Sequence, residues 1–168
     1  MPCPYKEFIY LNFIITNYEL RIDITLEVNN MIFLKSIIVW LVFILAESVN
    51  GTIRTFWLVP SLGDFWAHQI SFFTGSILVV AIATLFVKWL HATRTSQLLN
   101  IGILWMLLTL SFEIGLGRFV LGYSWQQIAA DYNLLNGGLM PIGLVLLILA
   151  PLIAAKIRGV ALNNNQTA

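Results

Sequence analysis

Apolar residues form four long runs along the chain, separated by short polar stretches. The runs cover 32–46 with a continuation to 59, then 70–90, 98–117 and 139–155. The hydrocarbon core of a bilayer is about 30 Å thick, so a helix needs about 20 residues to cross it. Because no water reaches the backbone there, an apolar run satisfies its N–H and C=O groups by forming a helix. The pattern therefore predicts an all-α fold, a four-helix transmembrane bundle over 31–158, followed by a polar C-terminal tail at 159–168.

The first thirty residues have a different pattern. From Tyr18 to Val28, apolar and polar residues alternate. A period of two is typical of a half-buried strand, although a lone strand would be an unpaired edge. Two interpretations stay open for this N-terminal extension, 1–30. It is either a peripheral strand or partner-binding arm, or it is disordered or untranslated sequence upstream of a start at Met31.

The first apolar run also has an alternative interpretation. If the chain starts at Met31, Lys35 followed by 36–46 resembles the basic end and short apolar core of a cleaved signal peptide. However, apolar residues resume at Ile53 and continue to Val59, and Glu47 has a counterpart in the second half of the chain. We therefore expect this run to be a membrane span.

Basic residues are distributed unevenly between the two ends of the spans. If the first span starts inside, the inner ends carry Lys35, Lys88, Arg94, Lys156 and Arg158, and the outer ends carry Arg54 and Arg118. Short cytoplasmic connections are enriched in Lys and Arg. The distribution therefore predicts an integral membrane protein with both termini in the cytoplasm.

Composition excludes several classes of protein. Hydrophobic residues make up 59% of the chain and charged residues 10%, whereas a soluble domain has about 25% charged residues. The formal net charge of +1 supplies no basic field for nucleic acid. The single cysteine excludes an intrachain disulfide and a cysteine-based zinc site. The two histidines are too few and too separated for a metal cluster, and no phosphate loop or hydrolase motif is present. We expect no cofactor, no metal and no enzymatic activity.

The second half of the chain repeats the order of several residues in the first half. The pairs are Glu47 with Glu113, Gly51 with Gly117, Trp57 with Trp125, Asp64 with Asp131, Gly75 with Gly143 and Lys88 with Lys156, at separations of 66 to 68 residues. A repeat of two spans predicts two tandem helical hairpins that point the same way in the membrane. Arg54 and Arg118 are 64 residues apart, which departs from this register.

Glu47 and Glu113 are acidic residues inside predicted spans. Counting 1.5 Å per residue places each roughly 20 Å from the inner end, within the outer leaflet. A charge at mid-bilayer costs about 2.5–3.5 kcal/mol on insertion scales, so each carboxylate should face protein rather than lipid. Each lies four residues before a glycine, Gly51 or Gly117, on the same helix face. This spacing predicts that another helix approaches closely at those glycines.

Two uses of these acids stay open. In the first, ion pairs between the repeats fix the hairpins, Glu47 with Arg118 and Glu113 with Arg54. In the second, a buried carboxylate carries protons or a cation in a small transporter or channel subunit. Both acids lie near one side of the membrane, and no series of carboxylates crosses to the other side, which favours the structural use.

The outer connections, 60–69 and 123–136, carry the remaining polar candidates. Trp125 and Tyr132 have the spacing of one helix face, which predicts a short interfacial helix. Asp64 and Asp131 would cap or solvate these connections, and His68 would lie at the interface. Catalysis on lipid at the outer surface by these residues is the less supported alternative.

Two stretches of the chain have a common pattern. The first comprises Ala46-Glu47, Gly51, Arg54 and Gly63-Asp64, and the second comprises Phe112-Glu113, Gly117-Arg118, Tyr123-Ser124-Trp125 and Asp131-Tyr132-Asn133. Over about 31–158 the chain resembles a group of small uncharacterised bacterial inner-membrane proteins. The resemblance implies four transmembrane helices and no established activity. We expect a structural or accessory component with the lipid bilayer, a second copy or another membrane protein as its partners, and the transporter is the alternative.

Overall fold

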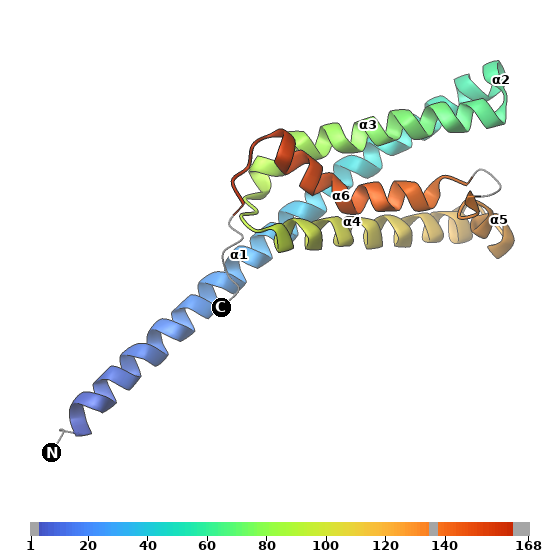
Figure 1. The fold of residues 1–168 in the computed structure, drawn as a ribbon. Helices are drawn as coiled ribbons and strands as arrows, with labels where there is room; N and C mark the ends of the chain where they lie inside the picture. Colours follow the sequence, from blue (N-terminus) through green and yellow to red (C-terminus); the bar gives the residue numbers. More distant parts are fainter. Residues whose placement is uncertain (1–3, 135–137, 163–168) are drawn as a thin grey trace. The chain divides into compact units, whose positions relative to one another are not determined.

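The computed structural model describes residues 4–134 and 138–162, with side chains from residue 15 onward (Figure 1). All regular secondary structure in this part of the chain is helical. The chain divides into two units, Met1–Leu34 and Lys35–Ala168. Helix α1, Pro4–Ile53, contributes to both units, and every later element belongs to the second.

Four helical stretches are long and apolar enough to cross a membrane. They are Ile15–Leu62, Asp64–Leu90, Thr95–Val120 and Met140–Ile157. They contain the long helices α1, α3 (Asp64–Leu90), α4 (Thr95–Gly115) and α6 (Met140–Ile157), the π-helices η1 (Arg54–Leu58) and η2 (Leu116–Val120), and the short helix α2 (Val59–Leu62). A second short helix, α5 (Trp125–Ala130), lies between the last two stretches. The prediction of an all-α protein with four spans is confirmed, including the continuation of the first span beyond Glu47.

The alternating segment 18–28 is helical, so its interpretation as a strand is wrong. Leu20 and Ile24 are more than half exposed, and the charged residues between them, Arg21 and Asp23, are exposed as well. A lone strand would leave its backbone groups unpaired, whereas a helix pairs them within the segment. The segment also continues directly into the apolar part of α1, so each added residue gains a hydrogen bond without a new nucleation step.

Helices α1 and α3 run in opposite directions. Near the end of α1, the Asn50 side chain donates a hydrogen bond to the backbone oxygen of Ser71, close to the start of α3. Near the start of the second unit, Lys35 Nζ donates to the backbone oxygen of Trp89, at the end of α3. Residues 35–90 therefore form one helical hairpin, which we call hairpin one.

Helices α1 and α4 run in the same direction, because contacts between them keep a constant separation in the sequence. Trp105 Nε1 donates to the Ser36 backbone oxygen at 2.9 Å, and Trp40 Nε1 donates to Thr109 Oγ1 at 3.1 Å. Phe43 packs against Trp105 with their ring centroids 4.7 Å apart. Trp105 is completely buried, so this contact forms the centre of the core.

Helix α6 packs against both α3 and α4. A Cβ added at Gly143 of α6 would lie 3.7 Å from the Phe72 ring of α3. Arg158 Nε, just after α6, donates to the Thr84 backbone oxygen of α3 at 3.1 Å. Helices α3 and α6 are thus parallel, and residues 95–157 form hairpin two. Both hairpins point the same way, as the sequence repeat predicts.

Only a narrow face of each helix is covered by the other helices. On α3 the buried residues recur every four positions, at Ala67, Ser71, Gly75, Val79, Ala83 and Val87. The other faces carry exposed apolar side chains, among them Phe73 and Ile77 at 64% and 70% exposure. A helix that is apolar all round yet covered on one stripe is suited to lipid on its remaining faces. The small residues in the stripe allow the neighbouring helices to approach.

The basic residues predicted for the inner ends of the spans gather at one end of the bundle, which we call the basic end. Lys88 lies in the last turn of α3, and Arg94 is the N-cap of α4. Lys35 Nζ binds the Trp89 carbonyl at 3.2 Å, and Lys156 and Arg158 lie at the end of α6. The connection between α1 and α3 and the connection between α4 and α6 lie at the opposite end.

Candidate functional site

Glu47 lies on α1 at its contact with α3. Asn50 Nδ2, one turn later, donates to Glu47 Oε2 at 3.2 Å and to the Ser71 backbone oxygen at 2.9 Å. Asn50 is only 8% exposed. The other carboxylate oxygen, Glu47 Oε1, is buried and has no hydrogen-bond partner. One amide therefore ties the Glu47 carboxylate to the backbone of α3.

The glycine that makes room for this carboxylate is Gly75 of α3. A Cβ added there would lie 2.7 Å and 2.9 Å from the two oxygens of Glu47, closer than carbon and oxygen pack without strain. At Gly51, where the sequence predicts the close approach, an added Cβ would have no heavy atom within 4 Å. The prediction for Gly51 is wrong because a four-residue spacing identifies a helix face but not the neighbour of that face.

Glu113, the counterpart of Glu47 in hairpin two, is exposed. Its carboxylate lies within electrostatic range of Asp131 and Glu47. The atoms nearest to a Cβ added at Gly117 would be side-chain carbons of Ile128 and Tyr123 at 3.6–3.7 Å, in the connection around α5. The structure brings the two acids into one region, and Glu47 is linked through Asn50 to α3.

Tyr132 is a member of this acidic region that the sequence did not single out. Its hydroxyl group is buried and has no hydrogen-bond partner among the described residues. Burial raises the pKa of Tyr132 above its ordinary value, and the negative charges of Glu113 and Asp131 raise this pKa further because they oppose formation of a phenolate. The only sequence signal was the position of Tyr132 on the apolar face of the predicted interfacial helix.

That interfacial helix is present as α5. Ser124 is its N-cap: the backbone N–H of Gln127 donates to Ser124 Oγ at 3.3 Å, and the Ser124 N–H donates to Gln127 Oε1 at 2.7 Å. This reciprocal pair is a capping box, which satisfies two backbone donors at the start of the helix. The first connection forms α2, a break at Gly63, and the start of α3. Of the predicted segment 123–136, residues 135 and 136 lie outside the described residues.

The two arginines of the opposite end contact groups other than the acids. Arg54 Nη1 lies 3.3 Å from His68 Nδ1. Arg118 Nη1 donates to the Tyr123 backbone oxygen at 3.2 Å, and its guanidinium lies 5.7 Å from the ring centroid of Trp125. These contacts keep both guanidinium groups beside the connections near the membrane surface.

The structure does not bring Glu47 and Arg118 together as an ion pair, and the pairing of Glu113 with Arg54 stays a prediction. Of the Glu47 oxygens, one accepts from Asn50 and the other has no partner, so Arg118 does not bind this carboxylate. Charge-reversal exchange of Glu47 with Arg118 stays the direct test of the pairing.

Asp64 and Asp131 occupy helix ends. Asp64 is exposed in the first turn of α3, where a negative charge favourably opposes the positive end of the helix dipole. Asp131 is the C-cap of α5, and its backbone oxygen accepts from the Met140 N–H at 3.3 Å. In the part of the chain that the structure describes, no three His, Cys, Asp or Glu side chains gather as a metal ion would require.

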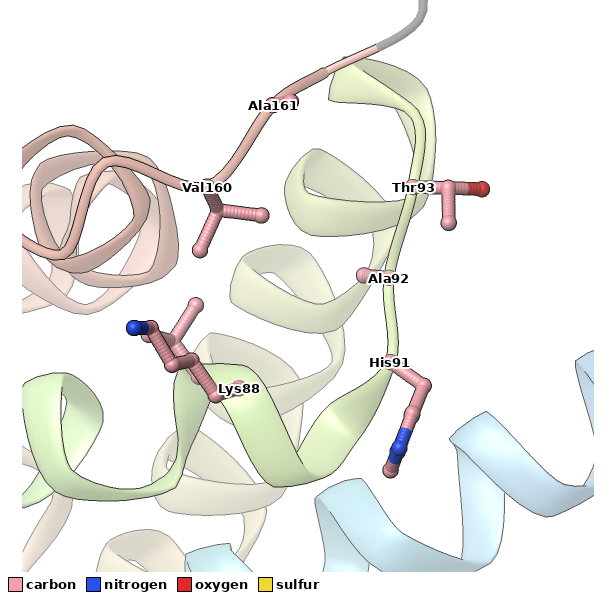
Figure 2. Close-up of a pocket in the computed structure, with 7 residues that line it drawn as sticks. Lys88, His91, Ala92, Thr93, Val160 and Ala161 are labelled. Carbon is pink, nitrogen blue, oxygen red and sulfur yellow. The ribbon is translucent and has the colours of Figure 1, made fainter.

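A cavity of about 270 Å³ lies at the basic end, between the end of α3 and the segment after α6 (Figure 2). Its lining residues are Val87, Lys88, His91, Ala92, Thr93, Val160 and Ala161. Figure 2 shows the Lys88 side chain reaching toward Val160. His91 turns the other way, and its Nδ1 lies 3.3 Å from Lys35 Nζ. The sequence contained only an indirect signal for this cavity, the excess of Lys and Arg at the inner ends.

No family model, curated protein or solved structure matches the chain. The comparisons therefore add no activity, and the resemblance to small bacterial inner-membrane proteins stays an expectation. The four apolar helices are those of an integral membrane protein.

Proposed function

We propose that this chain is a non-enzymatic structural or accessory component of a bacterial inner membrane. The observation that supports this role is the contact of Glu47 and Asn50 with α3. Asn50 bridges the carboxylate and the Ser71 backbone, and the carboxylate fills the space above Gly75. A side chain held in this way links two helices to one another.

The core between this contact and the basic end also supports a structural role. Val39, Phe43, Val79 and Trp105 are buried there, and none of them can pass a proton along a hydrogen-bonded chain. The partner of such a component is a second copy of the chain or another membrane protein. In our proposal the basic end faces the cytoplasm, as its five Lys and Arg residues favour.

A small proton or ion transporter is the second candidate function. It is favoured by the buried Glu47 oxygen that has no partner and by the electrostatic proximity of Glu113. A carboxylate with a vacant acceptor position inside a membrane can hold a proton or bind a cation. In this case Glu47 would be the carrying group, and Glu113 would modulate its charge.

Reconstitution in liposomes that contain a pH-sensitive dye separates the two functions. For a structural component, we expect wild-type vesicles to pass protons no faster than protein-free vesicles under an imposed pH gradient. We also expect Asn50→Ala to lower the free energy of unfolding by about 1–3 kcal/mol, since it leaves the Glu47 carboxylate without its donor. Ser48→Ala is the matched control, because Ser48 Oγ binds only Ile44 within its own helix.

A proton flux in wild-type vesicles that is lost in folded Glu47→Gln and kept in Glu113→Gln would reject the structural role and establish the transporter. The orientation has its own test in a Cys3→Ser background. A membrane-impermeant maleimide should label Ser61→Cys in intact spheroplasts, and it should label Thr93→Cys only after permeabilisation. Both side chains are exposed, at opposite ends of α3.

A further inference from the structure

The charges of the second unit are separated along the bundle. The basic end holds Lys35, Lys88, Arg94, Lys156 and Arg158, and the opposite end holds Glu47, Asp64, Glu113 and Asp131 with Arg54 and Arg118. Within residues 35–162, the basic end thus has five cationic side chains and no carboxylate. In a membrane, a group of cations at one end of a bundle attracts the anionic phosphates of lipid headgroups.

The cavity at the basic end places one of these cations beside an apolar surface. The Lys88 side chain is exposed at the cavity, and no hydrogen bond is recorded for its ammonium group among the described residues. Val87 and Val160 line the same cavity. A cationic group above an apolar floor matches the boundary in a phospholipid, where the phosphate meets the glycerol and the acyl chains.

A second cation is anchored on the same face of α3. Arg158 Nε donates to the Thr84 backbone oxygen at 3.1 Å, which leaves the remaining guanidinium donors for another acceptor. Thr84 lies four residues before Lys88, so the two positions are neighbours on one helix face. Lys35 differs, because its ammonium group already binds the Trp89 carbonyl.

We propose that the cavity lined by Val87, Lys88 and Val160 is a binding site for the phosphate headgroup of an anionic phospholipid. Lys88 and Arg158 bind the phosphate oxygens through charge-assisted hydrogen bonds, and the two valines contact the glycerol and upper acyl chains. The site rests on the integral membrane location of the chain and not on its structural or transport role. It would bind the same lipid if the chain proved to be a transporter.

Native mass spectrometry of the full chain in a neutral detergent tests the site. The probes are phosphatidylglycerol, phosphatidylcholine and inorganic phosphate, each titrated separately. We expect one phosphatidylglycerol to bind more tightly than any further copies, with phosphatidylcholine and inorganic phosphate binding weakly. Lys88→Gln should weaken the first phosphatidylglycerol by about 5-fold, the effect of one interfacial cation. Lys88→Arg should retain the binding.

Lys156→Gln is the matched control, since it removes the same charge from the same end but does not line the cavity. We expect it to weaken the binding of the first phosphatidylglycerol by less than about half as much as Lys88→Gln does. Equal losses in the two variants would overturn the site in favour of a diffuse field. Inorganic phosphate binding as tightly as phosphatidylglycerol would overturn the lipid as the ligand. Retained binding and an unchanged melting temperature in Lys88→Arg would show that the fold tolerates substitution at this position. A loss of binding in Lys88→Gln is then a loss of the site and not of the fold.

Discussion

Hairpins one and two have the same direction and share several residues in the same order, but their helices contact one another differently. In hairpin one the tightest contact of a described glycine is at Gly75, where the Glu47 carboxylate lies against the backbone of α3. In hairpin two it is at Gly102, where the backbone of α4 contacts the backbone oxygen of Ile148 on α6. One contact is made by a polar side chain and the other by two backbones.

This difference explains the different surroundings of the two acids. In hairpin one, α1 and α3 leave a space that accommodates a carboxylate and its Asn50 partner. In hairpin two, α4 and α6 approach at Gly102, near the basic end, and Glu113 remains exposed at the other end of α4. Residues that recur in the same order therefore accompany spans of the same direction. The contact within each hairpin depends on which small residues face one another across its two helices.

We expect the largest loss of stability from a methyl group placed in the backbone contact of hairpin two. In Gly102→Ala the new methyl group would overlap the Ile148 carbonyl, and this atom can move only if α4 and α6 separate. We expect a loss of about 3 kcal/mol in the free energy of unfolding, at the upper end for overpacking. Gly115→Ala on the same helix is the control, because an added Cβ there has no heavy atom within 4 Å. Unfolding by a denaturing detergent, followed by tryptophan fluorescence, measures both, and equal losses would contradict the close approach at Gly102.

A smaller effect should come from the polar contact of hairpin one. In Gly75→Ala the methyl group would meet the carboxylate of Glu47, which can rotate away at the expense of its bond from Asn50. We expect a loss of about 1–2 kcal/mol, and Gly51→Ala, with no atom within 4 Å, should change little.

A double-mutant cycle shows whether Glu47 is the obstacle. In a Glu47→Ala background, Gly75→Ala should cost at least about 0.5 kcal/mol less than it does in the wild type. Strictly additive effects would mean that the methyl group meets something other than the carboxylate.

We expect the smallest effect from the titration of Tyr132, which lies near Glu113 and Asp131 in hairpin two. In the repeat, Tyr132 corresponds to Phe65. Because phenylalanine has no hydroxyl group, hairpin one has no ionisable side chain at this position. The raised pKa of Tyr132 means that the folded chain holds the phenol proton more tightly than the unfolded chain does. Its contribution to stability is fully present below the ordinary pKa of about 10 and is lost as the pH rises through the raised pKa.

Ultraviolet difference titration of the wild type against Tyr132→Phe isolates the signal of this phenol. Glu113→Gln should shift the Tyr132 transition to lower pH, because it removes one of the charges that oppose the phenolate. An unchanged transition in Glu113→Gln would show that Glu113 does not contribute and that burial and the charge of Asp131 account for the raised pKa.

The spans were predictable because each depends on a local property, the summed hydropathy of about 20 consecutive residues. The strand assigned to 18–28 failed because alternation is informative only where a partner strand can pair. Nothing in a single sequence states whether such a partner exists. The short helix α5 was predicted from the spacing of Trp125 and Tyr132, but it ends at Ala130, before Tyr132. Its start is set locally by the cap that Ser124 and Gln127 form.

The sequence identified residues of the candidate site better than it identified the contacts between them. Glu47 stood out because a carboxylate inside an apolar run is costly, and this cost does not depend on the fold. Its pairing with Arg118 did not follow, because the contacts of each side chain depend on how α1, α3 and α4 rotate against one another. Asn50 and Gly75, the residues that contact the carboxylate, lie on two different helices.

By itself, the sequence determined that the chain has four helices long and apolar enough to cross a membrane, where they lie, and which of their ends carry the cations. These properties follow from the hydration of side chains, which each residue contributes almost independently of the others. The tertiary structure alone decided that Glu47 packs over Gly75 while Glu113 remains exposed, and that a cavity forms beside Lys88. Those outcomes depend on which small residues meet across two helices, and this is set only when the helices pack.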